Sequence, residues 1–167
     1  MRAIWNRRVK TLVGGLAVAA LVSACGPKAA QGPAPCAAPS APANPTASAV
    51  YNLANSDRAA NGLPALAWNR QLTCLASEWS AVMGASGYLR HRDLNVTIRS
   101  AGYASYRTLG ENILRGASSM TGAQMEAAWM ASAPHRANIL SSSFTSIGFG
   151  FAMGSDGRVY ATQNFGG

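Results

Sequence analysis

Hydrophobic positions recur at helical spacing through much of the chain and then alternate with small residues near its end. The helical stretches end at glycine, asparagine or proline, which are typical stop signals. They predict helices over 48–61, 69–86, 93–101 and 121–133. The alternation over 147–165, broken by Ser155-Asp156-Gly157, predicts a β-hairpin, and 110–114 is a candidate third strand. Helices followed by antiparallel strands indicate an α+β layered domain rather than a doubly wound sheet.

Residues 1–24 have the pattern of an export signal. Basic residues precede an apolar stretch over 11–21, and that stretch is shorter than the roughly 20 residues a permanent membrane helix needs. The run Val22-Ser23-Ala24-Cys25 also resembles the lipobox of bacterial lipoproteins. We therefore expect Cys25 to be lipidated and to anchor the protein on the extracytoplasmic face of a bacterial membrane. The alternative is plain secretion with an incidental cysteine.

The segment from Cys25 to residue 45 predicts a tether. It contains six of the eight prolines, set among Ala, Ser and Gly, and such a composition forms an extended spacer rather than a core. The globular domain is accordingly predicted over 46–167. Lipidation of Cys25 leaves Cys36 and Cys74 as an even pair in an oxidising compartment, which predicts a disulfide between them. Two free thiols are the alternative.

The distribution of charge argues against nucleic-acid binding. The formal net charge is +8, but four basic residues fall within the first ten positions. Beyond Lys28 the chain has nine arginines and no lysine, against six acidic residues. No basic stripe remains that could follow a phosphate backbone, so nucleic acid is not an expected partner.

The two histidines of the chain are the first candidates for chemistry. His91 and His135 each follow a predicted helix, so both are expected in loops. Glu111 occupies a strand-like position after Gly110, and a carboxylate with two imidazoles suits Zn²⁺. The alternatives are two surface histidines and a structural carboxylate that caps a neighbouring backbone group. No G-x-S-x-G elbow, P-loop or C-x-x-C motif is present.

Six ordered blocks of sequence resemble the CAP superfamily, named after cysteine-rich secretory proteins, antigen 5 and pathogenesis-related proteins. The blocks are Asn61 to Leu66 with Trp68-Asn69, His91-Arg92, Gly110-Glu111-Asn112-Ile113, Trp129 to Leu140, Phe144 to Gly148, and Thr162 to Gly166. The resemblance covers residues 48–167 and points to the short bacterial branch. It implies a three-layer α-β-α sandwich around an antiparallel sheet.

The resemblance also implies a cleft with two histidines and two acidic residues that binds divalent cations in some members. His91, Glu111 and His135 match three of these positions, whereas Ser132 stands where many eukaryotic members have Glu. Glu126 lies about 120° around the helix from Ser132 and does not replace it. One carboxylate fewer lowers the expected affinity for Zn²⁺ or Mg²⁺, the candidate cofactors.

The function expected from these observations is a non-catalytic binding module for a lipid or cell-envelope ligand, held at the membrane through Cys25. The alternative is a metal-dependent hydrolase acting on peptides or envelope polymers. Hydrolysis is the less favoured of the two because the cleft residues include no evident nucleophile, so that metal-bound water would have to take that role. A third reading is an extracytoplasmic scaffold whose histidines bind nothing.

Overall fold

The computed structural model describes residues 37–100 and 102–167. The export signal, the lipidation site Cys25 and the disulfide partner Cys36 lie outside the described residues, so the predictions made there stay predictions. The elements are α1 (Pro45–Ala60), β1 (Ala67–Trp68), α2 (Arg70–Ser86), α3 (Leu94–Thr97), β2 (Leu109–Ala117), α4 (Gly122–Ala131), α5 (Ala133–Ile139), β3 (Ser146–Met153) and β4 (Arg158–Gly166). None of the helices in this part of the chain is long and apolar enough to cross a membrane.

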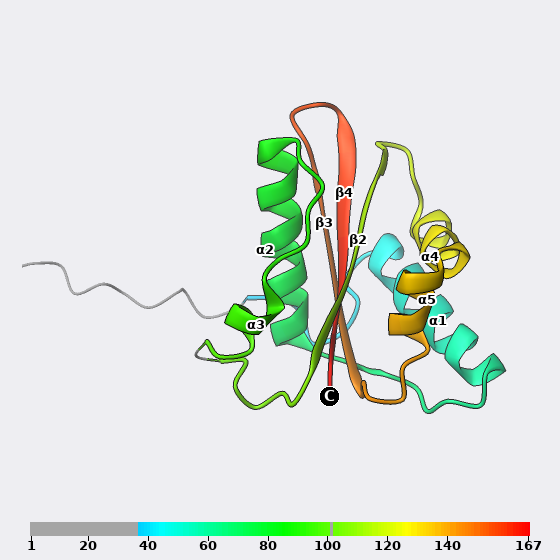
Figure 1. Cartoon of the computed structure of the whole chain (residues 1–167). Coiled ribbons are helices and arrows are strands. Elements are labelled where there is room, and N and C mark those ends of the chain that lie inside the picture. Colours follow the sequence, from blue (N-terminus) through cyan, green and yellow to red (C-terminus); the bar gives the residue numbers. More distant parts are fainter. Residues whose placement is uncertain (1–36, 101) are drawn as a thin grey trace, which may run out of the picture. The chain divides into compact units, whose positions relative to one another are not determined.

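The four strands form one sheet in the order β1-β3-β4-β2. Strands β3, β4 and β2 are antiparallel, as predicted, but the two-residue strand β1 runs parallel to β3. Helix α2 covers one face of the sheet, and α1, α4 and α5 lie on the other (Figure 1). The domain is therefore the α+β, three-layer α-β-α sandwich that the sequence predicts.

Helix α2 has clear local signals at both ends. The side chain of Asn69 accepts hydrogen bonds from the Gln71 and Leu72 N–H groups, and Gly87 ends the helix in the left-handed conformation at φ 72°. Its buried side packs on β3 at Gly148 and Gly150, where a β-carbon would overlap main-chain atoms of the helix. The two glycines therefore let α2 lie directly on the sheet.

The larger core lies between the other face of the sheet and helices α1 and α4. Alternate residues of β3 and β4 point into it, including Phe149 and Phe165, and they meet Val50, Met125 and Trp129 from the helices. All five side chains are buried. The period of two in β3 thus separates a face of glycines under α2 from a face of large side chains on the opposite side.

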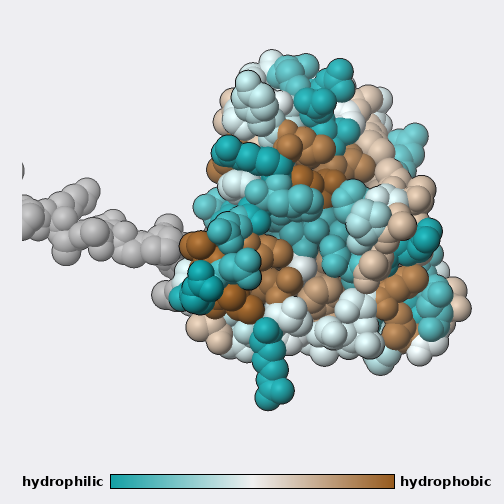
Figure 2. All heavy atoms as spheres, viewed as in Figure 1, coloured by the Kyte–Doolittle hydropathy of each residue, from teal (hydrophilic) through white to brown (hydrophobic). Residues whose placement is uncertain are grey.

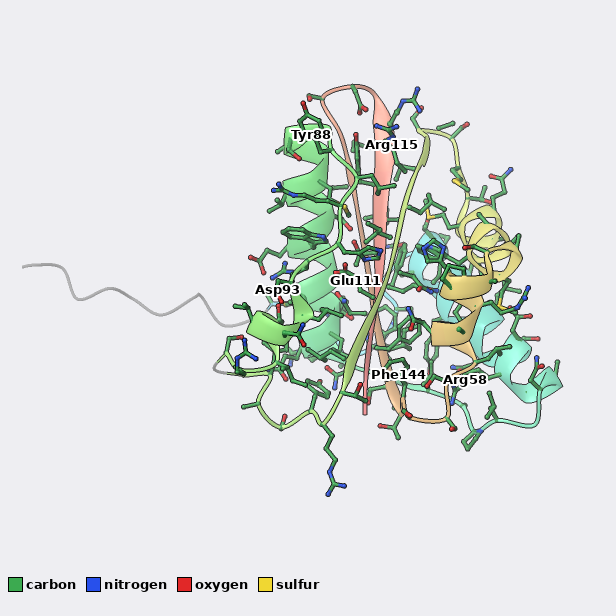
Figure 3. All side chains as sticks on the ribbon, viewed as in Figure 1. Arg58, Tyr88, Asp93, Glu111, Arg115 and Phe144 are labelled. Atoms are coloured by element: carbon green, nitrogen blue, oxygen red, sulfur yellow. The ribbon has the colours of Figure 1, made fainter. Side chains whose placement is uncertain are left out.

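Arg58 fixes the end of α1 to the loop before β3. Its side chain is 1% exposed and donates hydrogen bonds to the carbonyl oxygens of Pro64, Ile139, Ser141 and Phe144, at 2.7–3.4 Å. Figure 3 places Arg58 and Phe144 near one another at the base of this layer. The guanidinium group thus donates to one carbonyl oxygen after α1 and to three between the end of α5 and the start of β3.

The residues just before α1 also contact the domain. The carbonyl oxygen of Pro39 accepts a hydrogen bond from Trp68 Nε1 at 3.1 Å, and that of Ala38 accepts one from Arg70 Nε at 2.7 Å. Helix α1 itself begins at Pro45, capped by Asn44. The last part of the proline-rich segment therefore lies against the start of α2.

Two helices differ from the sequence prediction. Helix α3 has four residues, because Asp93 caps it and the chain turns after Thr97, whereas 93–101 was expected. Pro134 was expected to end a helix, yet it lies in the first turn of α5, where a proline ring is well tolerated. His135 therefore belongs to a helix, and its placement in a loop was wrong.

Candidate functional site

The candidate site is built on β2, an edge strand of the sheet. Successive residues of a strand point to opposite faces, so Glu111 faces the α2 side and Asn112 faces the α4–α5 side. Figure 3 shows Glu111 midway along this strand. Two neighbouring residues of β2 therefore contact both sides of the sheet. Glu111 contacts His91 on the α2 side, and Asn112 contacts His135 of α5 on the other side.

Glu111 holds the first histidine. His91 lies in the loop between α2 and α3, and its Nδ1 is 2.9 Å from Oε1 of Glu111. The same oxygen accepts the Arg92 N–H at 3.0 Å, and Oε2 lies 3.5 Å from Asn164 Nδ2. The Glu111 side chain is 1% exposed, whereas that of His91 is 59% exposed. The buried carboxylate therefore orients the imidazole through Nδ1, while more than half of the His91 side chain stays exposed.

Asn112 holds the second histidine from the other face. Its Nδ2 donates to the main-chain carbonyl oxygen of His135 at 3.0 Å. Burial, with a smaller contribution from the charge of His91, lowers the pKa of His135 below its ordinary value. His135 is accordingly neutral at physiological pH. Both histidines thus lie next to β2, His91 through its ring at Glu111 and His135 through its carbonyl oxygen at Asn112.

A chain of buried amides continues from Asn112 into the core. Asn112 Nδ2 also donates to Gln163 Oε1 at 3.0 Å, and Gln163 Nε2 donates to Glu126 Oε2 at 2.5 Å. Asn138 Nδ2 donates both to Asn112 Oδ1 and to the Glu111 carbonyl oxygen. We call Glu126, Gln163, Asn112 and Asn138 the amide relay. It joins α4, β4, β2 and α5.

Glu126 is the buried end of the relay. It is 1% exposed, and burial, together with the nearby negative charge of Asp57, raises its pKa to about 8. Its Oε2 accepts a hydrogen bond from Gln163 Nε2, so this carboxyl group belongs to the relay and not to the His91–Glu111 pair. Ser132 lies at the junction of α4 and α5, half-buried, and its side chain caps neither helix.

The residues in place supply only part of a metal site. Within 37–100 and 102–167, no three His, Cys, Asp or Glu side chains form a group that could hold a metal ion. Both oxygens of Glu111 already contact protein donors, which is the structural role given above as the alternative for this residue. Direct ligation would rest on His91 Nε2 and His135, two of the four ligands that Zn²⁺ ordinarily takes.

The face around β2 is mainly polar. In Figure 2, hydrophilic residues run across the middle of the molecule and separate several patches of hydrophobic residues. The same view in Figure 1 shows β2 running through this middle region. The surface over β2 in this view is therefore suited to a ligand with polar groups.

The relay residues were missed as functional candidates. Their signal in the sequence is the run Thr162-Gln163-Asn164, three polar residues in a strand that is otherwise hydrophobic, and all three are fully buried. Buried amides are rarely tolerated without partners. Which partners they have depends on the pairing of Asn112 with Gln163 across β2 and β4, and no local pattern reveals that register.

Replacing Asn112 by Asp should destabilise the domain more than the similar size of the two side chains suggests. The new oxygen would face two acceptors, the His135 carbonyl and Gln163 Oε1, in place of a donor to both. We expect Asn112→Asp to lower the free energy of unfolding by about 2–4 kcal/mol, measured by urea denaturation. Asn95→Asp, at an exposed position, is the matched control and should change it by less than about 0.5 kcal/mol. Equal effects of the two changes would contradict this role for Asn112.

Comparison with known proteins agrees with this architecture. Residues 51–165 match the family model described as the Cysteine-rich secretory protein family, CAP. The uncharacterized protein YkwD of Bacillus subtilis (strain 168) is 34% identical over 122 residues, which are 70% of this chain and 46% of that protein. The chain thus spans about half the length of this curated relative.

Solved structures show the same fold. An extracellular protein containing an SCP domain from Bacillus anthracis superposes with a TM-score of 0.56 at 28% identity, covering 70% of this chain and 38% of that one. An outer surface protein of Borrelia burgdorferi superposes with a TM-score of 0.61 at 16% identity, covering 72% and 91%. The latter likeness concerns the fold alone.

Proposed function

Because the chain belongs to the cysteine-rich secretory protein (CAP) family, we propose that it is an exported binding module whose ligand binds over β2, next to His91 and His135. Cys25 anchors it to the membrane by a lipid, and a disulfide from Cys36 to Cys74 fastens the tether to α2. The Bacillus anthracis neighbour is described as extracellular, which supports export. The lipobox and the proline-rich segment support the anchor.

The observation that supports a binding role is that both oxygens of the Glu111 carboxylate already contact protein groups. Its carboxylate is buried and occupied by His91, Arg92 N–H and Asn164. It is therefore unable to activate water at the surface, and Ser132 makes no side-chain hydrogen bond to either histidine in the described part of the chain. One oriented imidazole, a second histidine held through its main-chain carbonyl and no nucleophile favour binding over hydrolysis.

The ligand class that fits best is a polar component of the cell envelope. The hydrophilic residues across the middle of the face in Figure 2 offer hydrogen-bonding groups, which favours an envelope polymer or lipid headgroup over a buried acyl chain. A sedimentation assay with purified envelope polymer tests this. We expect residues 25–167 carrying Cys25→Ser to co-sediment, and His91→Ala or His135→Ala to reduce the bound fraction at least about tenfold.

The control for this assay is Arg136→Ala, which alters an exposed charge next to His135 without removing an imidazole. Binding that survives both histidine changes would place the ligand elsewhere on the protein. Loss of radiolabelled palmitate incorporation in Cys25→Ser cells tests the anchor separately, and retention of the label would refute it.

A metal-dependent hydrolase is the second candidate, favoured by the His91–Glu111 pair. A carboxylate that orients an imidazole is a common support for metal ligands and bases. Because His91 and His135 would supply only two of the four ligands that Zn²⁺ ordinarily takes, we expect weak metal binding. We expect calorimetric titration of Zn²⁺ to show at most one site, no tighter than about 1 µM, that either histidine-to-alanine change removes. Nanomolar binding with chelator-sensitive peptide or polymer cleavage would instead support the hydrolase.

A further inference from the structure

The amide relay has only one orientation that satisfies its members. The main-chain carbonyl oxygens of Glu111 and His135 can only accept hydrogen bonds. Asn138 must therefore donate to Glu111 and to Asn112 Oδ1, which leaves Asn112 Nδ2 to donate to His135. The same nitrogen donates to Gln163 Oε1, and Gln163 Nε2 must then donate to Glu126. The direction set by the Glu111 and His135 carbonyl oxygens is thus imposed on the buried carboxyl group of Glu126.

The carboxyl group of Glu126 accepts that hydrogen bond in surroundings that disfavour its ionised form. Its Oε1 is buried and has no partner among the described residues. Helix α1 brings the carboxylate of Asp57, which repels a second negative charge, and β4 brings only the neutral amide of Gln163. Arg58 of α1 directs its guanidinium to the carbonyls described above, and α5 presents the His135 carbonyl to Asn112. Glu111 of β2 faces the opposite side of the sheet.

We propose that Glu126 is a positioning residue for His135, acting through Gln163 and Asn112, and that a proton on Glu126 at neutral pH keeps the α4–α5 segment in place. With the proton bound, the carboxyl group is neutral, its carbonyl oxygen Oε2 accepts from Gln163, and no buried charge needs compensation. When the proton leaves, an unpaired carboxylate remains in the core beside Asp57. Helix α4 then moves to hydrate it, and the tie from Gln163 to Asn112 and His135 loosens.

The direction of the pH dependence follows from the burial of the acid. A raised pKa means that the folded protein binds this proton between the ordinary value for Glu and about 8. The ordered α4–α5 segment is therefore present at neutral and mildly acidic pH and is lost as pH rises through about 8. His135 itself has a lowered pKa, so its own titration is finished well before this step.

The experiment is an NMR titration that needs no ligand, so its outcome is independent of the proposed binding function. The full chain, in detergent micelles, is labelled with ¹³C only in histidine, and its two histidines give two ring and two carbonyl signals. His91→Gln assigns them. We expect the ring and carbonyl signals of His135 to show a step near pH 8 in the wild type and no step in Glu126→Gln, which mimics the neutral acid.

Two further variants separate the relay from a general effect of pH. Gln163→Met keeps the acid but cuts the relay, so the His135 carbonyl should no longer respond. Glu78→Gln makes the same chemical change at an exposed position, 67% accessible, and should leave the step intact. Absence of a step in the wild type, its survival in Glu126→Gln, or its survival in Gln163→Met would each overturn the proposal.

Discussion

A single methyl group at Gly148 should prevent α2 from packing on the sheet. The β-carbon of an alanine there would overlap the Thr73 nitrogen and the Leu72 carbonyl carbon, and would lie 2.7 Å from the Leu72 β-carbon. Main-chain atoms of a helix cannot rotate aside as a flexible side chain can, so the whole helix has to move. We expect Gly148→Ala to lower the free energy of unfolding by at least about 3 kcal/mol, measured by urea denaturation followed by circular dichroism.

The matched control is Gly157→Ala in the turn of the same hairpin. Gly157 has φ 72° and open space around it, so an added methyl group meets no neighbour and only the left-handed backbone is strained. That strain amounts to about 1 kcal/mol. A Gly148→Ala protein no less stable than the Gly157→Ala protein would show that α2 is not in close contact with β3.

Replacing Arg58 by methionine should be comparably damaging. Methionine fills similar space but leaves four carbonyl oxygens without their donor, in a region where Arg58 is 1% exposed. Unsatisfied carbonyls in the interior each cost about 1–3 kcal/mol. We expect a loss of at least about 3 kcal/mol in the free energy of unfolding, and only partial recovery with Arg58→Lys, because an ammonium group cannot span the same four carbonyl oxygens.

Arg136→Met provides the comparison for this second result. Arg136 is exposed and donates one hydrogen bond, to the Met130 carbonyl oxygen at 3.1 Å. Its replacement should lower stability by less than about 1 kcal/mol. If both arginine changes had the same effect in urea denaturation, Arg58 would not be the fastening point between α1 and the loop before β3.

The elements with strong periodic patterns could be predicted from the sequence. Helix α2 was expected over 69–86 and spans Arg70–Ser86, and the hairpin was expected with its turn at Ser155-Asp156-Gly157, between Met153 and Arg158. Strand β1 has two residues, too few for any pattern, and its pairing with β3 depends on a contact far along the chain. Helix α5 could not be predicted, because a proline such as Pro134 is as typical after the end of one helix as in the first turn of the next.

The candidate residues could be chosen from the sequence, whereas their arrangement could not. His91, Glu111 and His135 were identified by type and by family resemblance, and the structure brings all three to β2. Glu111 contacts His91 and Arg92 because the loop after α2 returns to the sheet at this point. No local pattern in the sequence predicts that return. The relay through Gln163 depends on strand register, which is set by the whole sheet.

The position of β4 has a consequence for the order in which the domain folds. This strand lies between β3 and β2, yet it is the last element of the domain along the chain. Until residues 158–166 have been synthesised, β2 and β3 have no common neighbour, and both layers of helices lack the centre of the surface on which they pack. The sheet therefore cannot be completed before β4 is present. Pairing of β2 with β4 also has to bring together two segments that are separated in the chain by α4, α5 and β3. A chain that stays open through synthesis is in the state required for passage through a narrow export channel.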